Sequence, residues 1–135
     1  MSTMLAVDDE PDILQALAAY LEATVPGLRV VTAASGPEAL AEIEKGKPDI
    51  VLSDYKMPGM TGLELLARVA RVHPDVPCLM MTAYADSELA MRAVHEARVR
   101  QFLTKPVDPQ RLAAVVRELL GQPLAKTGNA REGSS

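Results

Sequence analysis

The sequence predicts an α/β protein in which a single doubly wound parallel sheet of five strands is covered by five helices. Three observations predict this fold. Short apolar runs alternate five times with longer segments of helical periodicity. Parallel neighbours need crossover connections, which are usually helices. The central runs at 50–52 and 78–81 are apolar throughout rather than alternating, which is typical of strands covered on both faces.

The first two strand–helix units occupy the N-terminal third of the chain. Residues 3–7 form a compact apolar run and predict the first strand. Apolar side chains then recur with helical spacing over 13–21, and Pro26-Gly27 ends that helix. The run 28–32 is rich in β-branched residues and predicts the second strand. The segment Ser35-Gly36-Pro37-Glu38 has the spacing of a capping box and opens the second helix.

The same pattern repeats in the middle of the chain. Residues 49–53 predict the third strand, and 77–82 predict the fourth. Between them, Thr61-Gly62-Leu63-Glu64 is a second capping-box spacing that begins a helix with one apolar face. The periodicity of 87–97 predicts the fourth helix.

The last unit precedes a change in composition. Residues 99–104 predict the fifth strand, and Asp108 followed by Pro109 is a strong start signal for the last helix. From Gly121 onward the apolar periodicity stops, and small and polar residues dominate. We therefore expect one domain over residues 1–121 and a flexible tail or the start of a linker over 122–135.

Composition narrows the functional class. The 135 residues suit one domain, and 48% hydrophobic with 24% charged residues is typical of a soluble globular protein. Fourteen basic against eighteen acidic residues leave a net charge of −4, which disfavours direct nucleic-acid binding. A lone cysteine cannot form an internal disulfide, and no apolar run reaches the ~20 residues of a membrane span. We expect a cytoplasmic protein that does not associate with membranes.

Polar residues follow four of the predicted strands. Asp8 and Asp9 follow the first strand, Asp54 the third, and Lys105 the fifth, while Thr82 ends the fourth. Carboxyl ends of parallel strands meet at one edge of the sheet, so these side chains should converge. Clustered carboxylates repel unless they share a cation, and oxygen ligands alone select a hard ion such as Mg²⁺. With the ammonium and the hydroxyl as anion donors, the edge predicts a Mg²⁺ site that handles phosphate.

Each of these residues also has a simpler explanation. Asp8 or Asp9 can cap the first helix, and Asp54 can form a turn in a loop rich in Gly and Pro. Thr82 can simply end a strand, and Lys105 can be a solvated surface charge. Because these explanations are independent, none accounts for all five residues sharing one edge. A common site is the better explanation.

Four motifs in this order and spacing resemble the receiver domain of bacterial response regulators, over roughly residues 4–120. The motifs are Val7-Asp8-Asp9-Glu10-Pro11, residues 53–62, Met81-Thr82-Ala83 and Lys105-Pro106. The resemblance implies a flavodoxin-like fold with strand order 2-1-3-4-5. It also implies a cis peptide bond between Lys105 and Pro106.

The resemblance assigns a role to each acid at the edge. Asp54 would accept a phosphoryl group from the phosphohistidine of a histidine kinase. Asp8, Asp9 and Asp54 would hold the Mg²⁺, with Asp9 preferred over Asp8 as a direct ligand, and the backbone carbonyl of Lys56 would complete the protein ligands. The domain would then be a signalling module, with only limited self-catalysed phosphorylation and dephosphorylation.

The resemblance also implies a conformational switch. Lys105 would pair with one phosphoryl oxygen and Thr82 would hydrogen-bond another, so that Thr82 gains a partner when Asp54 is modified. Phe102, at the position of the family's switch aromatic, would rotate into the space that Thr82 vacates; plain core packing is its simpler explanation. Lys56 and Tyr84 would flank the route of the attacking water and tune the lifetime of the acyl phosphate.

The expected partners are a histidine kinase or phosphotransfer protein and a downstream effector domain or protein, and the resemblance allows a homodimer on phosphorylation. Arg92, His95 and Arg98 repeat every three residues in the fourth helix, as a docking stripe or as a solvated face.

Two other functions compete. A Mg²⁺-dependent phosphohydrolase with an Asp nucleophile would need Asp-x-Asp-x-Thr after the first strand, where this chain has Asp8-Asp9-Glu10-Pro11-Asp12. A flavodoxin-like mononucleotide binder would need a phosphate-cradling loop there instead of carboxylates.

Overall fold

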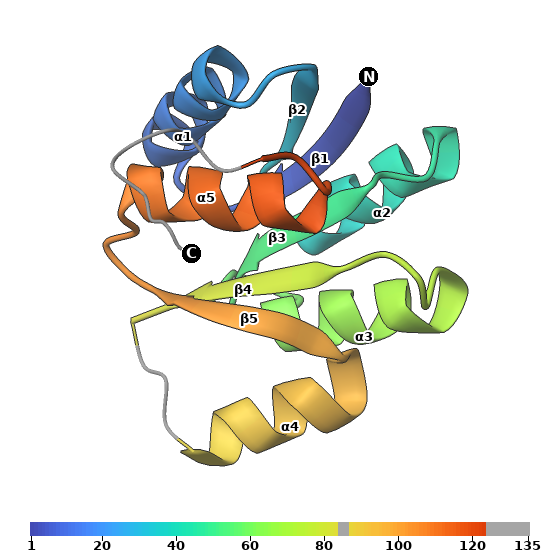
Figure 1. The fold of residues 1–135 in the computed structure, drawn as a ribbon. Helices are drawn as coiled ribbons and strands as arrows, with labels where there is room; N and C mark the ends of the chain where they lie inside the picture. The colour runs from blue at the N-terminus through green and yellow to red at the C-terminus, as the bar shows by residue number, and fades with distance from the viewer. Residues whose placement is uncertain (84–86, 124–135) are drawn as a thin grey trace.

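Strands and helices alternate throughout the described part of the chain. The computed structural model describes residues 1–83 and 87–123, and Figure 1 shows its ribbon. The strands are β1 (Ser2–Val7), β2 (Leu28–Ala33), β3 (Ile50–Asp54), β4 (Cys78–Thr82) and β5 (Val99–Thr104). The helices are α1 (Pro11–Thr24), α2 (Gly36–Lys45), α3 (Gly62–Val72), α4 (Ser87–Ala97) and α5 (Pro109–Leu119). The predicted alternation is confirmed.

The strands form one sheet in the order β2-β1-β3-β4-β5, and every neighbouring pair is parallel. Helices α1 and α5 cover one face, while α2, α3 and α4 cover the other (Figure 1). Each face has its own core, and successive residues of β1 point into opposite cores: Leu5 and Val7 into one, Met4 and Ala6 into the other. Burial on both faces explains the continuous apolar runs.

The chain reverses its direction of travel across the sheet at β1. From β1 it crosses to β2 on one side, and β3 then returns to pair with the other side of β1. This reversal opens a crevice beyond the carboxyl ends of β1 and β3, which is where ligands bind in open α/β sheets. Val7 lies opposite Ser53, so the residues that follow them come out side by side.

Local side-chain bonds fix where two helices begin. The Thr61 hydroxyl accepts the N–H of Glu64 at 3.2 Å, and the Glu64 carboxylate accepts the N–H of Thr61 at 2.9 Å. This is the complete capping box that the spacing predicts. The Asp108 carboxylate accepts the N–H of Gln110 at 3.0 Å and begins α5 as expected.

The capping box predicted at Ser35 is only half formed. Ser35 caps α2, with its hydroxyl accepting the N–H of Glu38 at 3.2 Å. The Glu38 carboxylate, however, accepts the N–H of Ala34 at 3.1 Å rather than that of Ser35. The return bond is therefore made one residue earlier than the prediction requires, at the start of the β2–α2 loop.

Four of the five strands differ from their predicted ranges by one residue at one or both ends. The first begins at Ser2 rather than at residue 3, and the second ends at Ala33 rather than at residue 32. The fourth strand begins at Cys78 rather than at Pro77, which has no N–H to donate to a ladder.

The third strand runs from Ile50 to Asp54 rather than over 49–53. Asp49 stays bonded to β1, since its N–H donates to the Thr3 carbonyl at 2.8 Å and its carboxylate accepts the N–H of Thr3 at 2.8 Å. The last residue of β3, Asp54, pairs with Met81 of β4.

The end of the described chain is hydrogen-bonded to the turn between α1 and β2. The Gln122 side-chain amide donates to the carbonyl of Pro26 at 2.8 Å. The predicted tail lies almost wholly at 124–135, outside the described residues, so the domain boundary stays a prediction. Within the described ranges, no helix combines the length and hydropathy needed to cross a bilayer.

Candidate functional site

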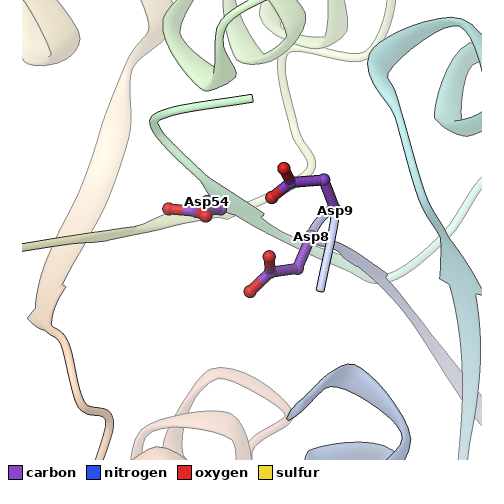
Figure 2. Close-up of side chains that lie close together, drawn as sticks. All are labelled: Asp8, Asp9 and Asp54. Carbon is purple, nitrogen blue, oxygen red and sulfur yellow. The ribbon is translucent and has the colours of Figure 1, made fainter. Parts of the chain in front are cut away.

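Three aspartates meet at the carboxyl ends of β1 and β3. One carboxylate oxygen from each of Asp8, Asp9 and Asp54 lies within 4.8 Å of the others. Figure 2 shows the three carboxyl groups around one common space. Asp8 and Asp54 are buried, with 0% and 5% of their surface exposed, whereas Asp9 is exposed to solvent. The convergence predicted from the sequence is observed, with one of the three acids open to the surroundings.

Lys105 holds this cluster together from the end of β5. Its Nζ lies 3.0 Å from Oδ2 of Asp54 and 3.5 Å from Oδ2 of Asp8. The backbone N–H of Lys105 donates to the carbonyl of Thr82 at 3.0 Å, which fixes the start of its loop beside β4. The peptide bond that follows, to Pro106, is cis, as the resemblance implies. Lys105 is thus a partner of two buried carboxylates and not a solvated surface charge.

Glu10 is a fourth acid at the site and was not predicted from the sequence. Its Oε1 lies 3.6 Å from the Nζ of Lys105, and its backbone N–H donates to Oδ1 of Asp8 at 3.0 Å. In the sequence, only the position of Glu10 directly after Asp8 and Asp9 indicates a role at the site. That position does not predict the direction of its side chain, because the residue stands at the start of a helix. Glu10 also occupies the N-cap position of α1, so neither aspartate caps that helix.

Burial and mutual repulsion shift the ionisation of the cluster. Desolvation raises the pKa of Asp8 and the nearby Asp54 carboxylate raises it further, against the opposing effects of the Glu10 N–H and Lys105. Burial alone lowers the pKa of Lys105, but the hydrogen bond and charge of Asp54, with the charge of Asp8, outweigh it and raise that pKa. Lys105 is therefore cationic at neutral pH, and one cation faces several carboxylates.

The acids open into a cavity of about 630 Å³. Asp9, Lys56, Thr82 and Lys105 line it together with Asp54. Lys56 is exposed, while Thr82, the last residue of β4, is only 2% exposed. The other residue predicted to tune phosphate lifetime, Tyr84, lies outside the described residues.

The predicted switch residue Phe102 lies on β5, which β4 separates from β3, the strand that ends in Asp54. It pairs with Met80 in the β4–β5 ladder and is partly buried against the core beneath α2, α3 and α4. This packing matches its simpler explanation. In the β4–β5 ladder Thr82 pairs with Thr104, so Phe102 lies two residues before the partner of Thr82 on β5.

The residues at the edge fit a hard divalent cation. The donors are carboxylate oxygens, and the part of the chain that the structure describes contributes no His or Cys to the group. The raised pKa of Asp8 means that its anionic form is costly without a further positive charge. Mg²⁺ suits such a site because it binds one or two carboxylates and retains several waters.

A family comparison gives this arrangement its context. The family model described as "Response regulator receiver domain" matches residues 4–117. The chain belongs to this receiver-domain family. It is thus a receiver module of two-component signalling, a class of domain that is not a classical enzyme, and the phosphohydrolase alternative is not favoured.

Similar proteins extend the comparison. The receiver domain is 38% identical to the transcriptional regulatory protein GlrR of Escherichia coli (strain K12), over 92% of this chain and 27% of that protein. It is 37% identical to the DNA-binding transcriptional regulator NtrC of Salmonella typhimurium, over 82% of this chain and 23% of that protein. The chain thus spans about a quarter of these relatives.

Solved structures confirm the fold. The chain superposes on a CheY-like receiver domain protein from Methanospirillum hungatei with a TM-score of 0.83 and 32% identity, covering 90% of this chain and 94% of that one. A receiver domain from Clostridium thermocellum gives a TM-score of 0.80 at 29% identity, with coverages of 90% and 95%. The predicted fold and strand order are confirmed.

Proposed function

We propose that Asp54 accepts a phosphoryl group from a histidine kinase or phosphotransfer protein in a Mg²⁺-dependent reaction, and that this modification switches an output surface. The observation that carries the proposal is the burial of the Asp54 carboxylate together with the charged groups around it. It is nearly buried, lies 3.0 Å from the Lys105 ammonium and belongs to the same cluster as Asp8 and Asp9. A nucleophile, a cation and acidic metal ligands thus meet at the mouth of one cavity.

Asp8, Asp9 and Asp54 would hold the Mg²⁺, with the backbone carbonyl of Lys56 as a further ligand. Asp9 is the exposed acid of the cluster, so it meets an incoming ion first and is our preferred direct ligand. When bound, the ion neutralises part of the charge on the transferring phosphoryl oxygens. The same charge relieves the repulsion between Asp8 and Asp54.

In the transfer step a carboxylate oxygen of Asp54 attacks the phosphorus of the phosphohistidine. The new O–P bond forms as the P–N bond breaks, and the electron pair of that bond stays with the departing imidazole. The Lys105 ammonium moves from the carboxylate to a phosphoryl oxygen and balances its charge. The Thr82 hydroxyl donates to another phosphoryl oxygen.

This new bond of Thr82 would transmit the change through the sheet. Thr82 and Phe102 sit on paired strands, so an inward movement of Thr82 changes the space available to the ring. Because the ring has no hydroxyl, it can turn inward without leaving a polar group unsatisfied. The output surface would comprise α4, β5 and α5.

The acyl phosphate would be lost when water attacks the phosphorus and the O–P bond to Asp54 breaks, returning the carboxylate and inorganic phosphate. Lys56 lines the cavity and is placed to hinder that water or to hold the phosphoryl group. Tyr84 is proposed for the same role. The half-life of the phosphorylated Lys56→Ala, Tyr84→Ala protein checks this, and an unchanged half-life contradicts it.

We further propose that the receiver acts in the cytoplasm on a downstream effector. Relatives several times longer than this chain are named as transcriptional regulators, and one is named as DNA-binding. The receiver itself carries a net charge of −4, which disfavours direct contact of this segment with nucleic acid. The receiver would act on its effector, for example, by forming a homodimer on phosphorylation.

The decisive experiment is phosphorylation of the purified domain by acetyl phosphate, followed as a phosphoryl adduct in the intact-protein mass. We expect an adduct with Mg²⁺, none after chelation, and none in Asp54→Ala. Asp75→Ala is the matched control, because Asp75 is an exposed aspartate paired with Lys47 and remote from the cavity. Equal labelling of Asp54→Ala, or labelling that is indifferent to Mg²⁺, contradicts the proposal.

A further inference from the structure

A second concavity lies between α3 and α4, which pack side by side on the same face of the sheet (Figure 1). It has a volume of about 520 Å³ and shares no lining residue with the acidic cavity. Met60, Leu63 and Ala67 supply apolar side chains to its lining. Met60 and Ala67 are half-buried and Leu63 is buried, so these side chains form a partly accessible apolar floor. We call this feature the α3–α4 groove.

Arginines give the groove its charge. Arg68 and Arg71 line it from α3, and Arg92 lines it from α4. The Nε of Arg92 lies 3.1 Å from an oxygen of Glu96 in an exposed ion pair. Within residues 1–83 and 87–123, no carboxylate forms an ion pair with Arg68 or Arg71. Among the described residues these two guanidinium groups therefore have no paired carboxylate, on a chain whose net charge is −4.

The two acids that line the groove, Glu64 and Glu96, form no ion pair with Arg68 or Arg71. Glu64 lines the groove, but its carboxylate accepts the backbone N–H of Thr61 in the capping box of α3. Glu96 is engaged by Arg92. The positive charge of Arg68 and Arg71 is thus available to an incoming anionic group.

The spacing of these charges fits a helical ligand. Residues three apart on a helix lie on one side, with Cβ atoms about 5–6 Å apart, so Arg68 and Arg71 point the same way along α3. Carboxylates three or four residues apart on a second helix have the same spacing. A helix with acids on one side and apolar residues beside them would contact the arginines and the floor together.

We propose that the α3–α4 groove docks an acidic amphipathic helix of a partner protein. Its carboxylates pair with Arg68 and Arg71, and its apolar side chains cover Met60, Leu63 and Ala67. Nucleic acid suits the groove less well, because a phosphate backbone needs a longer array of cations and the rest of this chain repels it. The proposal does not depend on phosphorylation of Asp54.

The test is a titration of the ¹⁵N-labelled domain with a synthetic peptide of about three helical turns, carrying glutamates at every third or fourth position and leucines on the adjoining face. We expect amide shifts clustered at 59–71 and 92–96 and saturable binding. The double variant Arg68→Glu, Arg71→Glu should weaken binding about tenfold or more, because two charge-assisted contacts become repulsive.

Matched controls separate docking from non-specific attraction. Arg29→Glu, Arg111→Glu reverses the same charge at exposed sites of β2 and α5, and should change the affinity by less than about twofold. Asp54→Ala should bind like the parent domain, so this result stands whether or not Asp54 is the phosphoacceptor. Equal binding of a peptide with lysine in place of glutamate, unchanged affinity in the double variant, or tighter binding of a short DNA duplex would overturn the proposal.

Discussion

At the scale of single residues, Lys105 keeps a group of acids together before any metal binds. Its ammonium is the cation 3.0 Å from Asp54 and 3.5 Å from Asp8, and its side chain is only 20% exposed. Removing one partner of such a group leaves the others desolvated without compensation. Lys105 should thus contribute to the stability of the metal-free domain as well as to phosphoryl transfer.

We therefore predict that Lys105→Met lowers the free energy of unfolding by about 1–3 kcal/mol in chelator at pH 7. The raised pKa of Lys105 means that its contribution is fully present below its unfolded pKa of 10.5 and is lost only as pH rises through the folded value. Urea unfolding measures the change. Lys45→Met is the control, because Lys45 is 71% exposed in its pair with Glu42 and should cost less than about 0.5 kcal/mol. Equal effects of the two variants would contradict the prediction.

Asp8 should oppose stability when no metal is bound. Its folded pKa lies above the ordinary aspartate pKa of 3.8, so the native state binds the proton more tightly than the unfolded chain. Stability therefore falls as pH rises from 3.8 through the folded pKa and then levels off. Asp8→Asn, whose amide can still accept the Glu10 N–H, should lack this pH dependence and be more stable than the parent at pH 7 without Mg²⁺.

Mg²⁺ should reverse that order. A ligand at ten times its Kd adds about 1.4 kcal/mol to the parent domain, whereas Asp8→Asn binds the ion more weakly and gains less. Urea titrations at pH 4 and pH 7, each with Mg²⁺ and with chelator, measure both effects. If Asp8→Asn were the less stable protein in chelator at pH 7, burial of the Asp8 charge would not be the cost that we infer.

At the scale of elements, the β3–α3 connection passes unusually close to the site. A Cβ on Gly62 would lie 2.2 Å from the carbonyl oxygen of Asp54 and 3.0 Å from Cα of Tyr55. The N–H of Gly62 also donates to the carbonyl of Tyr55 at 2.8 Å. The first turn of α3 therefore packs directly against the backbone that presents Asp54.

Gly62→Ala should accordingly lower the free energy of unfolding by about 1–3 kcal/mol and slow phosphorylation of Asp54, because the obstacle is backbone and cannot rotate away. Gly46→Ala is the matched control, since nothing lies within 4 Å of its added Cβ and its φ of 175° is extended backbone. Urea unfolding and the rate of acetyl phosphate labelling test both consequences. A harmless Gly62→Ala would mean that α3 is free to move away from the site.

The end of α4 shows a backbone conformation that its sequence does not favour. Arg98 follows the helix with a φ of 51°, in the left-handed region that glycine adopts more readily. We predict that Arg98→Gly raises the free energy of unfolding by about 0.5 kcal/mol. Arg100→Gly, in the interior of β5, should instead lower it. Thermal melts of the two variants give the signs, and a destabilised Arg98→Gly would show that the side chain contributes more than the backbone costs.

At the scale of the whole molecule, much of the architecture was predictable because its signals are local. Apolar runs, turn residues and caps such as Thr61 are read within a few positions, and parallel strands then bring Asp8, Asp54 and Lys105 to one edge. Glu10 was missed because the direction of its side chain depends on how α1 leaves the sheet. The hydrogen bonds between Asp49 and Thr3 join residues 46 positions apart, a contact that no local sequence pattern indicates.

The α3–α4 groove was missed for the same reason. The sequence places Arg92 in a repeat along one helix, whereas the groove combines it with Arg68 and Arg71 from another. Only the packing of α3 against α4 brings those side chains to a common surface. The periodicity of one element therefore does not predict a surface that is formed by two elements distant in the sequence.

The single sheet makes a broader prediction. Both cores contain residues of β1, β3 and β4, so a ligand held at the ends of these strands should stabilise the domain as a unit. Beryllofluoride with Mg²⁺, at a hundred times its Kd, should add about 2.7 kcal/mol to the free energy of unfolding. Hydrogen exchange should then slow in core amides on both faces, including those of α1 and α3, and not only in loops near the cavity. Asp54→Ala should show neither effect. Protection confined to the loops around Asp54 would mean that the two cores unfold separately, and that a signal from Asp54 does not need the sheet to reach α4 and β5.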